Sequence, residues 1–90
     1  MQNLQRLEQA RALCESDSFG QGDYIALLDH EMRTPLGALI SASEVLEAVA
    51  PGSPDDAAAR AVIVRQVRQM RYVLDELVRI GRTLASRQER

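Results

Sequence analysis

The sequence contains one histidine, His30, and a carboxylate, Glu31, follows it directly. A neutral imidazole is a nucleophile near neutral pH. If the carboxylate accepts a hydrogen bond from Nδ1–H, it orients the ring and leaves the Nε2 lone pair free to attack an electrophile. A terminal phosphoryl group is such an electrophile, and the product would be a phosphoramidate. A lone His-Glu pair is most often an ordinary surface pair, so the surrounding residues must decide its function.

Residue types and spacing exclude other uses of this histidine. Two zinc ligands on one helix face would need a second histidine four residues on, where Thr34 stands, so we expect no metal site. The chain has no nucleophile elbow for a triad hydrolase. Its single cysteine, Cys14, excludes an internal disulfide framework. We expect Cys14 to be a small apolar filler in a reducing compartment; the alternative is an inter-chain disulfide across a dimeric helix pair that acts as a redox input.

The composition favours packed helices and a soluble fragment. Hydrophobic residues make up 46% of the 90 residues but aromatic residues only 3%, so the apolar content is mostly Ala, Leu, Val and Ile. Sheets favour aromatic and β-branched residues instead. The formal net charge of -2 argues against nucleic-acid binding. No apolar run approaches the roughly 20 residues of a membrane span, so we expect no membrane contact in this fragment. The expected location is cytoplasmic, either as a cytoplasmic protein or as the cytoplasmic part of a membrane-bound sensor.

The N-terminal residues predict a short helix followed by a break. Residues 1–16 have a coiled-coil-like stripe that Arg11 interrupts, and we interpret them as the end of a longer helix because the stripe is too short to be stable alone. Residues 17–23 contain two glycines and predict a break. We expect Asp23 to be the N-cap of the next helix. The stripe consists of Leu4, Leu7 and Cys14.

Two long helices are predicted at residues 24–50 and 54–86, joined by a turn at residues 51–54. Apolar residues recur in both at alternating spacings of three and four, which is a heptad pattern. Ser53 is the expected N-cap of the second helix and Pro54 its first residue. The first seam is Ile25, Leu28, Met32, Pro35, Leu39, Ala42, Leu46 and Val49, and the second is Ile63, Val67, Met70, Leu74, Leu77, Gly81 and Leu84.

Such helices predict an all-α fold, an antiparallel helical hairpin with an N-terminal coiled-coil-like extension. More apolar residues flank the seams than one hairpin can cover, so we expect two copies to form a homodimeric four-helix bundle. The alternative is a hairpin that packs on another domain of its own chain. The flanking residues are Leu36, Ile40, Val73, Val78 and Ile80.

The helical repeat predicts where the histidine points. At about 100° per residue, His30 lies roughly 160° from the centre of the first seam. Thr34, Gly37 and Ser41 continue this outer stripe. We therefore expect an imidazole that is presented to solvent, with small or polar neighbours. Pro35 lies on the seam and is expected to kink the helix because it lacks an N–H.

Residues 30–36, His-Glu-Met-Arg-Thr-Pro-Leu, resemble the H-box of sensor histidine kinases of bacterial two-component systems. Residues 70–78 are similar to the closing pattern of the second helix in that family. The resemblance covers about residues 17–86 and implies a dimerisation and histidine-phosphotransfer domain at residues 17–90. It also implies that residues 1–16 are a signalling helix or linker that delivers input from upstream.

The resemblance implies roles for three residues. His30 matches the phosphoaccepting histidine, and Glu31 matches the acidic residue that activates the imidazole. Thr34 matches the position that helps to place a water for dephosphorylation of the regulator in bifunctional members. Asp29 stands where the family commonly has a small residue, and Gly81 interrupts the second seam.

The resemblance also implies the cofactor and the partners. The activity would be that of a protein-histidine kinase, but the sequence contains no asparagine box and no glycine-rich nucleotide box, so we expect no cofactor site in this chain. ATP, with magnesium, would be held by a separate catalytic domain, and the phosphoryl group would pass to the receiver domain of a response regulator. Two alternatives stay open: a non-catalytic dimeric adaptor that binds or inhibits a kinase, and an Arg-rich DNA-binding hairpin, against which the net acidity counts.

Overall fold

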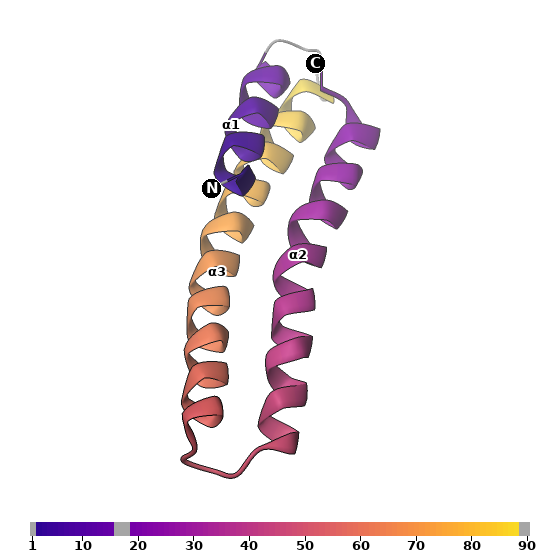
Figure 1. Cartoon of the computed structure of the whole chain (residues 1–90). Helices are drawn as coiled ribbons and strands as arrows, with labels where there is room; N and C mark the ends of the chain where they lie inside the picture. The colour runs from indigo at the N-terminus through magenta and orange to yellow at the C-terminus, as the bar shows by residue number, and fades with distance from the viewer. Residues whose placement is uncertain (1, 16–18, 89–90) are drawn as a thin grey trace. The chain divides into compact units, whose positions relative to one another are not determined.

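The computed structural model describes residues 2–15 and 19–88, which form three helices and no strand. These are α1 (Gln2–Glu15), α2 (Gln21–Ala48) and α3 (Pro54–Gln88), and a short turn joins α2 to α3 (Figure 1). The predicted all-α hairpin with an N-terminal helix is therefore confirmed. The side chains of Leu4 and Cys14, two members of the predicted N-terminal stripe, lie outside the described residues.

The chain divides into two compact units. The terminal unit comprises Met1–Glu31 and Tyr72–Arg90, so it contains α1, the start of α2 and the end of α3. The turn unit comprises Met32–Arg71, with the end of α2, the turn and the start of α3. His30 and Glu31 belong to the terminal unit, whereas Thr34 belongs to the turn unit.

Local capping chemistry fixes the start of α3 in the turn unit, as predicted. The Asp56 N–H donates to Ser53 Oγ at 3.1 Å, and Pro54 is the first helical residue. The Asp56 carboxylate in turn accepts from the Gly52 N–H and from Arg60 Nε, each at 3.1 Å. Gly52 has φ 81°, a left-handed conformation that glycine adopts without steric cost. The cap of Ser53 and the position of Pro54 are thus confirmed.

The start of α2 differs from the prediction, because Asp23 is not its N-cap. The helix begins at Gln21, and the Tyr24 N–H donates to the Gly20 carbonyl at 3.0 Å. The Asp23 carboxylate reaches back and accepts from the Gly20 N–H at 2.9 Å. An acidic side chain in the third helical position that bonds the N-cap amide is one half of a capping box. Gly20 is therefore the cap, and Asp23 stabilises it from inside the helix.

The residues buried within the single chain are only partly those of the predicted seams: Pro35, Ala42, Leu77 and Leu84 are buried as predicted. Ile25, Val67 and Leu74 are 63%, 48% and 52% exposed, whereas Val73 and Ile80, predicted to flank the seam, are buried. A heptad pattern marks one broad apolar face, and the chain's own hairpin covers only one edge of it. The buried apolar residues are Leu7, Ala10, Phe19, Leu27, Val73, Leu77, Ile80 and Leu84 in the terminal unit, and Pro35, Ala42 and Ala59 in the turn unit.

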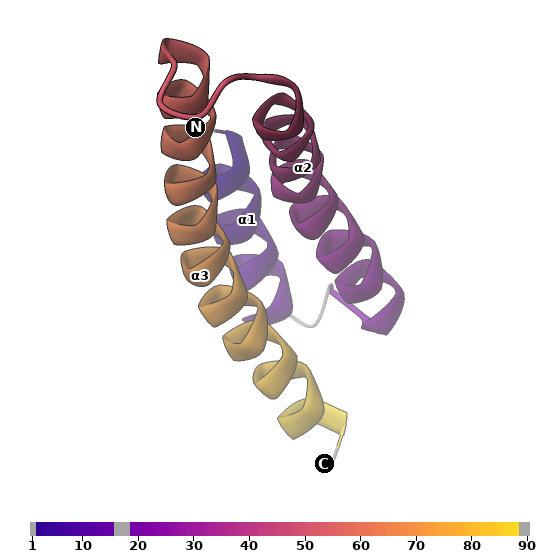
Figure 2. The same ribbon diagram turned by 90° about the horizontal axis from the view of Figure 1, so that it is seen from below.

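Helix α1 packs against α2 and α3 inside the terminal unit (Figure 2). Leu7 and Ala10, one turn apart, are both buried. Arg11, which interrupts the apolar stripe in the sequence, forms an ion pair with Glu76 of α3. The interruption in the stripe therefore has a structural use, since the arginine neutralises a carboxylate that is itself buried.

Gly81 makes room for an aromatic side chain of α2. The Tyr24 hydroxyl donates to the Leu77 carbonyl at 3.0 Å, and a Cβ built on Gly81 would lie 2.9 Å from that hydroxyl oxygen. The absence of a side chain at this seam position is therefore required by the packing of Tyr24 on α3.

This packing predicts opposite effects for two glycine substitutions. Gly81→Ala is expected to lower the free energy of unfolding by about 1 kcal/mol, because overpacking and the disturbed hydrogen bond outweigh the gain in helix propensity. Gly37→Ala is the matched control: nothing lies within 4 Å of its added Cβ, so it should raise stability by about 0.5–1 kcal/mol. Urea unfolding followed by circular dichroism measures both, and equal stabilisation by the two variants would contradict the packing role of Gly81.

Candidate functional site

His30 is exposed on α2, as the helical repeat predicts. It lies in the terminal unit at a groove of about 360 Å³ between α1 and the start of α2. A reactant can therefore reach the imidazole, and one wall of the groove belongs to α1. The groove is lined by Arg6, Gln9, Ala10, Leu13, Phe19, Asp23, Ala26, Leu27 and His30.

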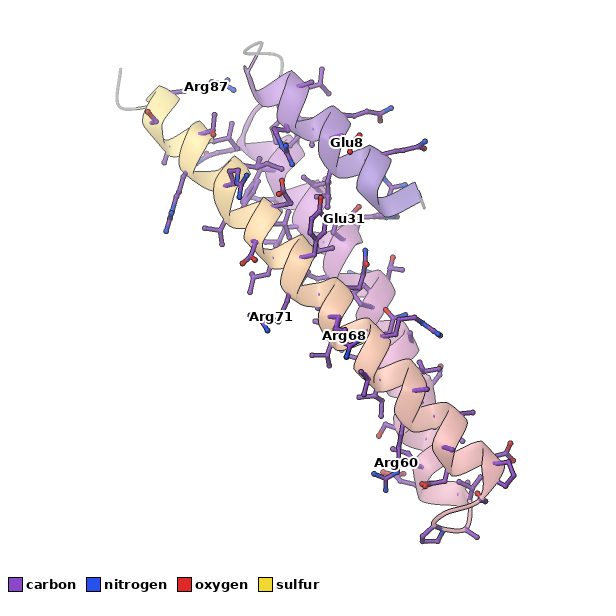
Figure 3. The ribbon with its side chains drawn as sticks, turned by 90° about the vertical axis from the view of Figure 1, so that its left-hand side faces the viewer. Glu8, Glu31, Arg60, Arg68, Arg71 and Arg87 are labelled. Carbon is purple, nitrogen blue, oxygen red and sulfur yellow. The ribbon has the colours of Figure 1, made fainter. Side chains whose placement is uncertain are left out.

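Glu31 has the opposite environment, although it is the next residue in the chain. Its side chain is 0% exposed, and its Oε1 accepts from Arg6 Nη1 of α1 at 3.4 Å. Figure 3 labels Glu31 among the side chains of the terminal unit. The second oxygen, Oε2, is buried without a hydrogen-bond partner. Consecutive residues of a helix point about 100° apart. The carboxylate thus faces the interior of the terminal unit, and its role toward His30 stays a prediction.

Thr34 is exposed in the turn unit, one helical turn after His30 along α2. The next residue, Pro35, is buried, and α2 stays helical through it. A proline has no N–H to give to the carbonyl four residues earlier, here that of Glu31. The helix is therefore weakened directly after the H-box histidine and its neighbour, while the predicted kink stays a prediction.

The sequence analysis did not predict two ion pairs that join α1 to the other helices of the terminal unit. Arg6 pairs with Glu31, and Arg11 pairs with Glu76, which also lies 3.9 Å from Arg79 Nη1. Glu76 and Glu31 are both buried. The sequence feature that could have predicted these ion pairs is the position of two carboxylates on buried faces of the predicted helices. Buried acidic groups need a positive partner. Their partners come from 25 and 65 residues away in the chain.

The described residues contain neither a candidate metal cluster nor a candidate membrane span. No group of three or more His, Cys, Asp or Glu residues gathers there as a metal site would require. Among the described helices, none is both long enough and apolar enough to cross a membrane.

The described part of the chain is thus a set of helices that presents one histidine, followed directly by an acidic residue, to solvent. The His Kinase A (phospho-acceptor) domain family, HisKA, matches residues 21–85. Because the match spans more than half of the chain, the chain belongs to this family, whose domains are parts of histidine kinases in two-component signalling. The resemblance of the H-box is thereby confirmed. Neither a curated protein nor a solved structure matches the chain significantly.

Proposed function

We propose that this chain is the cytoplasmic dimerisation and phosphoacceptor domain of a sensor histidine kinase, in which His30 accepts the γ-phosphoryl group of ATP. Nε2 attacks the γ-phosphorus of an ATP that a separate catalytic domain holds. The Nε2–P bond forms, the bond between that phosphorus and the β,γ-bridging oxygen breaks, and ADP leaves. Magnesium bound with the nucleotide would neutralise charge on the phosphates. The exposure of His30 inside the region that matches the family supports this proposal.

The second half of the proposed reaction returns the histidine to its first state. A carboxylate oxygen of an aspartate in a response-regulator receiver attacks the phosphorus of phospho-His30. An acyl phosphate forms, the N–P bond breaks, and neutral imidazole is left. We assign to Thr34, whose side chain is exposed, the placing of a water that later hydrolyses the acyl phosphate.

A groove in the turn unit suits a helix of the receiver. It has a volume of about 430 Å³ and lies between the end of α2 and the start of α3. Small apolar side chains predominate along it, so another helix can approach the two backbones closely. Its lining residues are Ala38, Ser41, Ala42, Val45, Asp55, Ala58, Ala59 and Val62.

We assign the homodimer contact to the exposed apolar residues. In the turn unit, α2 exposes Leu36 and Ile40, and α3 exposes Val64 and Val67. Monomers rarely expose so many large apolar side chains without a partner. In the terminal unit, Ile25 is exposed and precedes His30 by five residues, about 140° around the helix. A second copy on the side of Ile25 would therefore leave the imidazole open.

Phosphoryl labelling tests the proposed function. The chain is mixed with ATP and the catalytic domain of a related histidine kinase, and in a parallel sample with a phosphorylated receiver for back-transfer. We expect one phosphoryl group per chain, released by acid and stable in base as a phosphoramidate is. A chain that takes no label from either donor, or whose label survives acid, contradicts the proposal and favours a non-catalytic adaptor.

A further inference from the structure

The structure holds the carboxylate of Glu31 away from the surface on which His30 lies. Glu31 is fully buried, Arg6 of α1 binds its Oε1, and its Oε2 has no hydrogen-bond partner. A buried carboxylate with one unsatisfied oxygen is costly. Removal of α1 would expose this carboxylate and remove its bond to Arg6. The carboxylate would then be more stable facing outward, where water or another donor can bind its oxygens.

Helix α1 is attached on the side of the terminal unit where His30 is reached. Arg6, Gln9 and Leu13 of α1 line the same groove as His30. The apolar side chains Ile25 and Leu74, by contrast, are exposed, so α1 does not cover them. A dimer formed through those side chains is therefore compatible with a docked α1. We expect the docking of α1 to affect the surroundings of His30 and not the formation of the dimer.

The attachment of α1 is weak enough to be reversible. It has 14 residues, and a helix of this length is marginal on its own in water. Among its described side chains, Leu7 and Ala10 are the buried apolar ones. The two ion pairs, Arg6–Glu31 and Arg11–Glu76, supply its charged contacts with α2 and α3.

We propose that docked α1 restrains the phosphoacceptor, with Arg6 as the positioning residue that keeps Glu31 from His30. When α1 leaves, the carboxylate becomes available to accept a hydrogen bond from the Nδ1–H of His30, which exposes the Nε2 lone pair. The input that detaches α1 thereby sets the reactivity of the imidazole. This inference deepens the proposed function and rests on it for its biological meaning, but the contact itself is tested separately.

The tautomer of His30 reports the contact without any phosphoryl transfer. Because the chain has one histidine, its ring nitrogens give a single set of signals in ¹H–¹⁵N spectra. The spectra are recorded in alkaline buffer, since only a neutral imidazole has two tautomers. Arg6→Gln should raise the population of the Nδ1–H tautomer. Arg6→Lys, which keeps the charge, should not, and Arg6→Gln combined with Glu31→Gln should cancel the rise.

Two further variants separate the loss of the Arg6 pair from general damage. Arg11→Gln loosens α1 through Glu76 without touching Glu31, so it should also raise the Nδ1–H population. Arg82→Gln, at an exposed arginine of α3 in the same unit, is the matched control and should change nothing. If neither Arg6→Gln nor Arg11→Gln changes the tautomer, or if Arg82→Gln changes it equally, the inference is overturned.

Reactivity is then measured with potassium phosphoramidate, which needs no protein partner. Its P–N bond breaks, ammonia leaves, and the Nε2–P bond forms, so the rate reports the nucleophile alone. We expect Arg6→Gln to be labelled about tenfold faster than the unaltered chain, and the double variant with Glu31→Gln to lose the gain. An unchanged rate overturns the inference. If the tautomer changes but the chain takes no label from a kinase or a receiver, the result contradicts the proposed function and not this inference.

Discussion

The substitution His30→Gln is expected to abolish phosphoryl labelling, with a loss of at least about a thousand-fold in rate. Glutamine keeps a polar side chain of similar length but has no nitrogen lone pair that can attack phosphorus. His30 is exposed, so the variant should keep the fold to within about 0.5 kcal/mol. Labelling with ATP and a related catalytic domain measures the loss, and circular dichroism checks that the helices are retained.

Two neighbouring variants make the result specific. Asp29→Asn alters the exposed residue directly before the histidine and should keep most of the label. Glu31→Gln should also keep the label, and in the Arg6→Gln background it should slow labelling about tenfold, since acid–base assistance is available only when α1 no longer holds the carboxylate. Label that persists in His30→Gln would show that another residue is the acceptor, and the assignment would fail.

Those features of the fold that depend on local chemistry could be predicted from the sequence. Ser53 and Pro54 identify the start of α3 because a hydroxyl cap and a residue without an N–H satisfy the same helix end. At the start of α2 the prediction of Asp23 as the N-cap was wrong, since an aspartate can cap a helix or stabilise the cap from inside and the sequence does not distinguish the two. In the structure the Gly20 N–H donates to the Asp23 carboxylate, so Asp23 stabilises the cap from inside the helix.

The faces of the helices were harder to predict than the helices themselves. Apolar residues at heptad spacing belong either to the contact within one chain or to a contact with a second chain. Burial separates the two: Val73 and Ile80 pack within the chain, whereas Val67 and Leu74 stay exposed. Nothing in the spacing distinguishes these pairs, because the two members of each pair are seven residues apart.

The exposure of His30 could be predicted from the sequence, whereas the burial of Glu31 could not. His30 follows from the angle between its position and the apolar seam, which is a property of one helix. Glu31 depends on α1, whose Arg6 comes from 25 residues earlier in the chain. Residue spacing within α2 contains no information on whether α1 docks there, and so the inward carboxylate was not foreseen.

Charge on the exposed apolar face is expected to break the proposed homodimer. Val67 is 48% exposed in the single chain, and we place it in the contact with the second copy. Val67→Glu would bury one unpaired carboxylate per subunit, and two such penalties of about 2 kcal/mol each weaken the dimer about a thousand-fold. Sedimentation or light scattering at several concentrations should give twice the chain mass for the unaltered protein and the chain mass for the variant.

The matched control places the same charge on another side of α3. Ala61 is exposed and precedes Val67 by six residues, which is about 120° around the helix. Ala61→Glu should therefore leave the dimer intact, and both variants should keep their helical circular dichroism. If Val67→Glu stays dimeric while Ala61→Glu becomes monomeric, the contact lies on the other side of the hairpin. The exposed apolar side chains of the turn unit would then need a different partner.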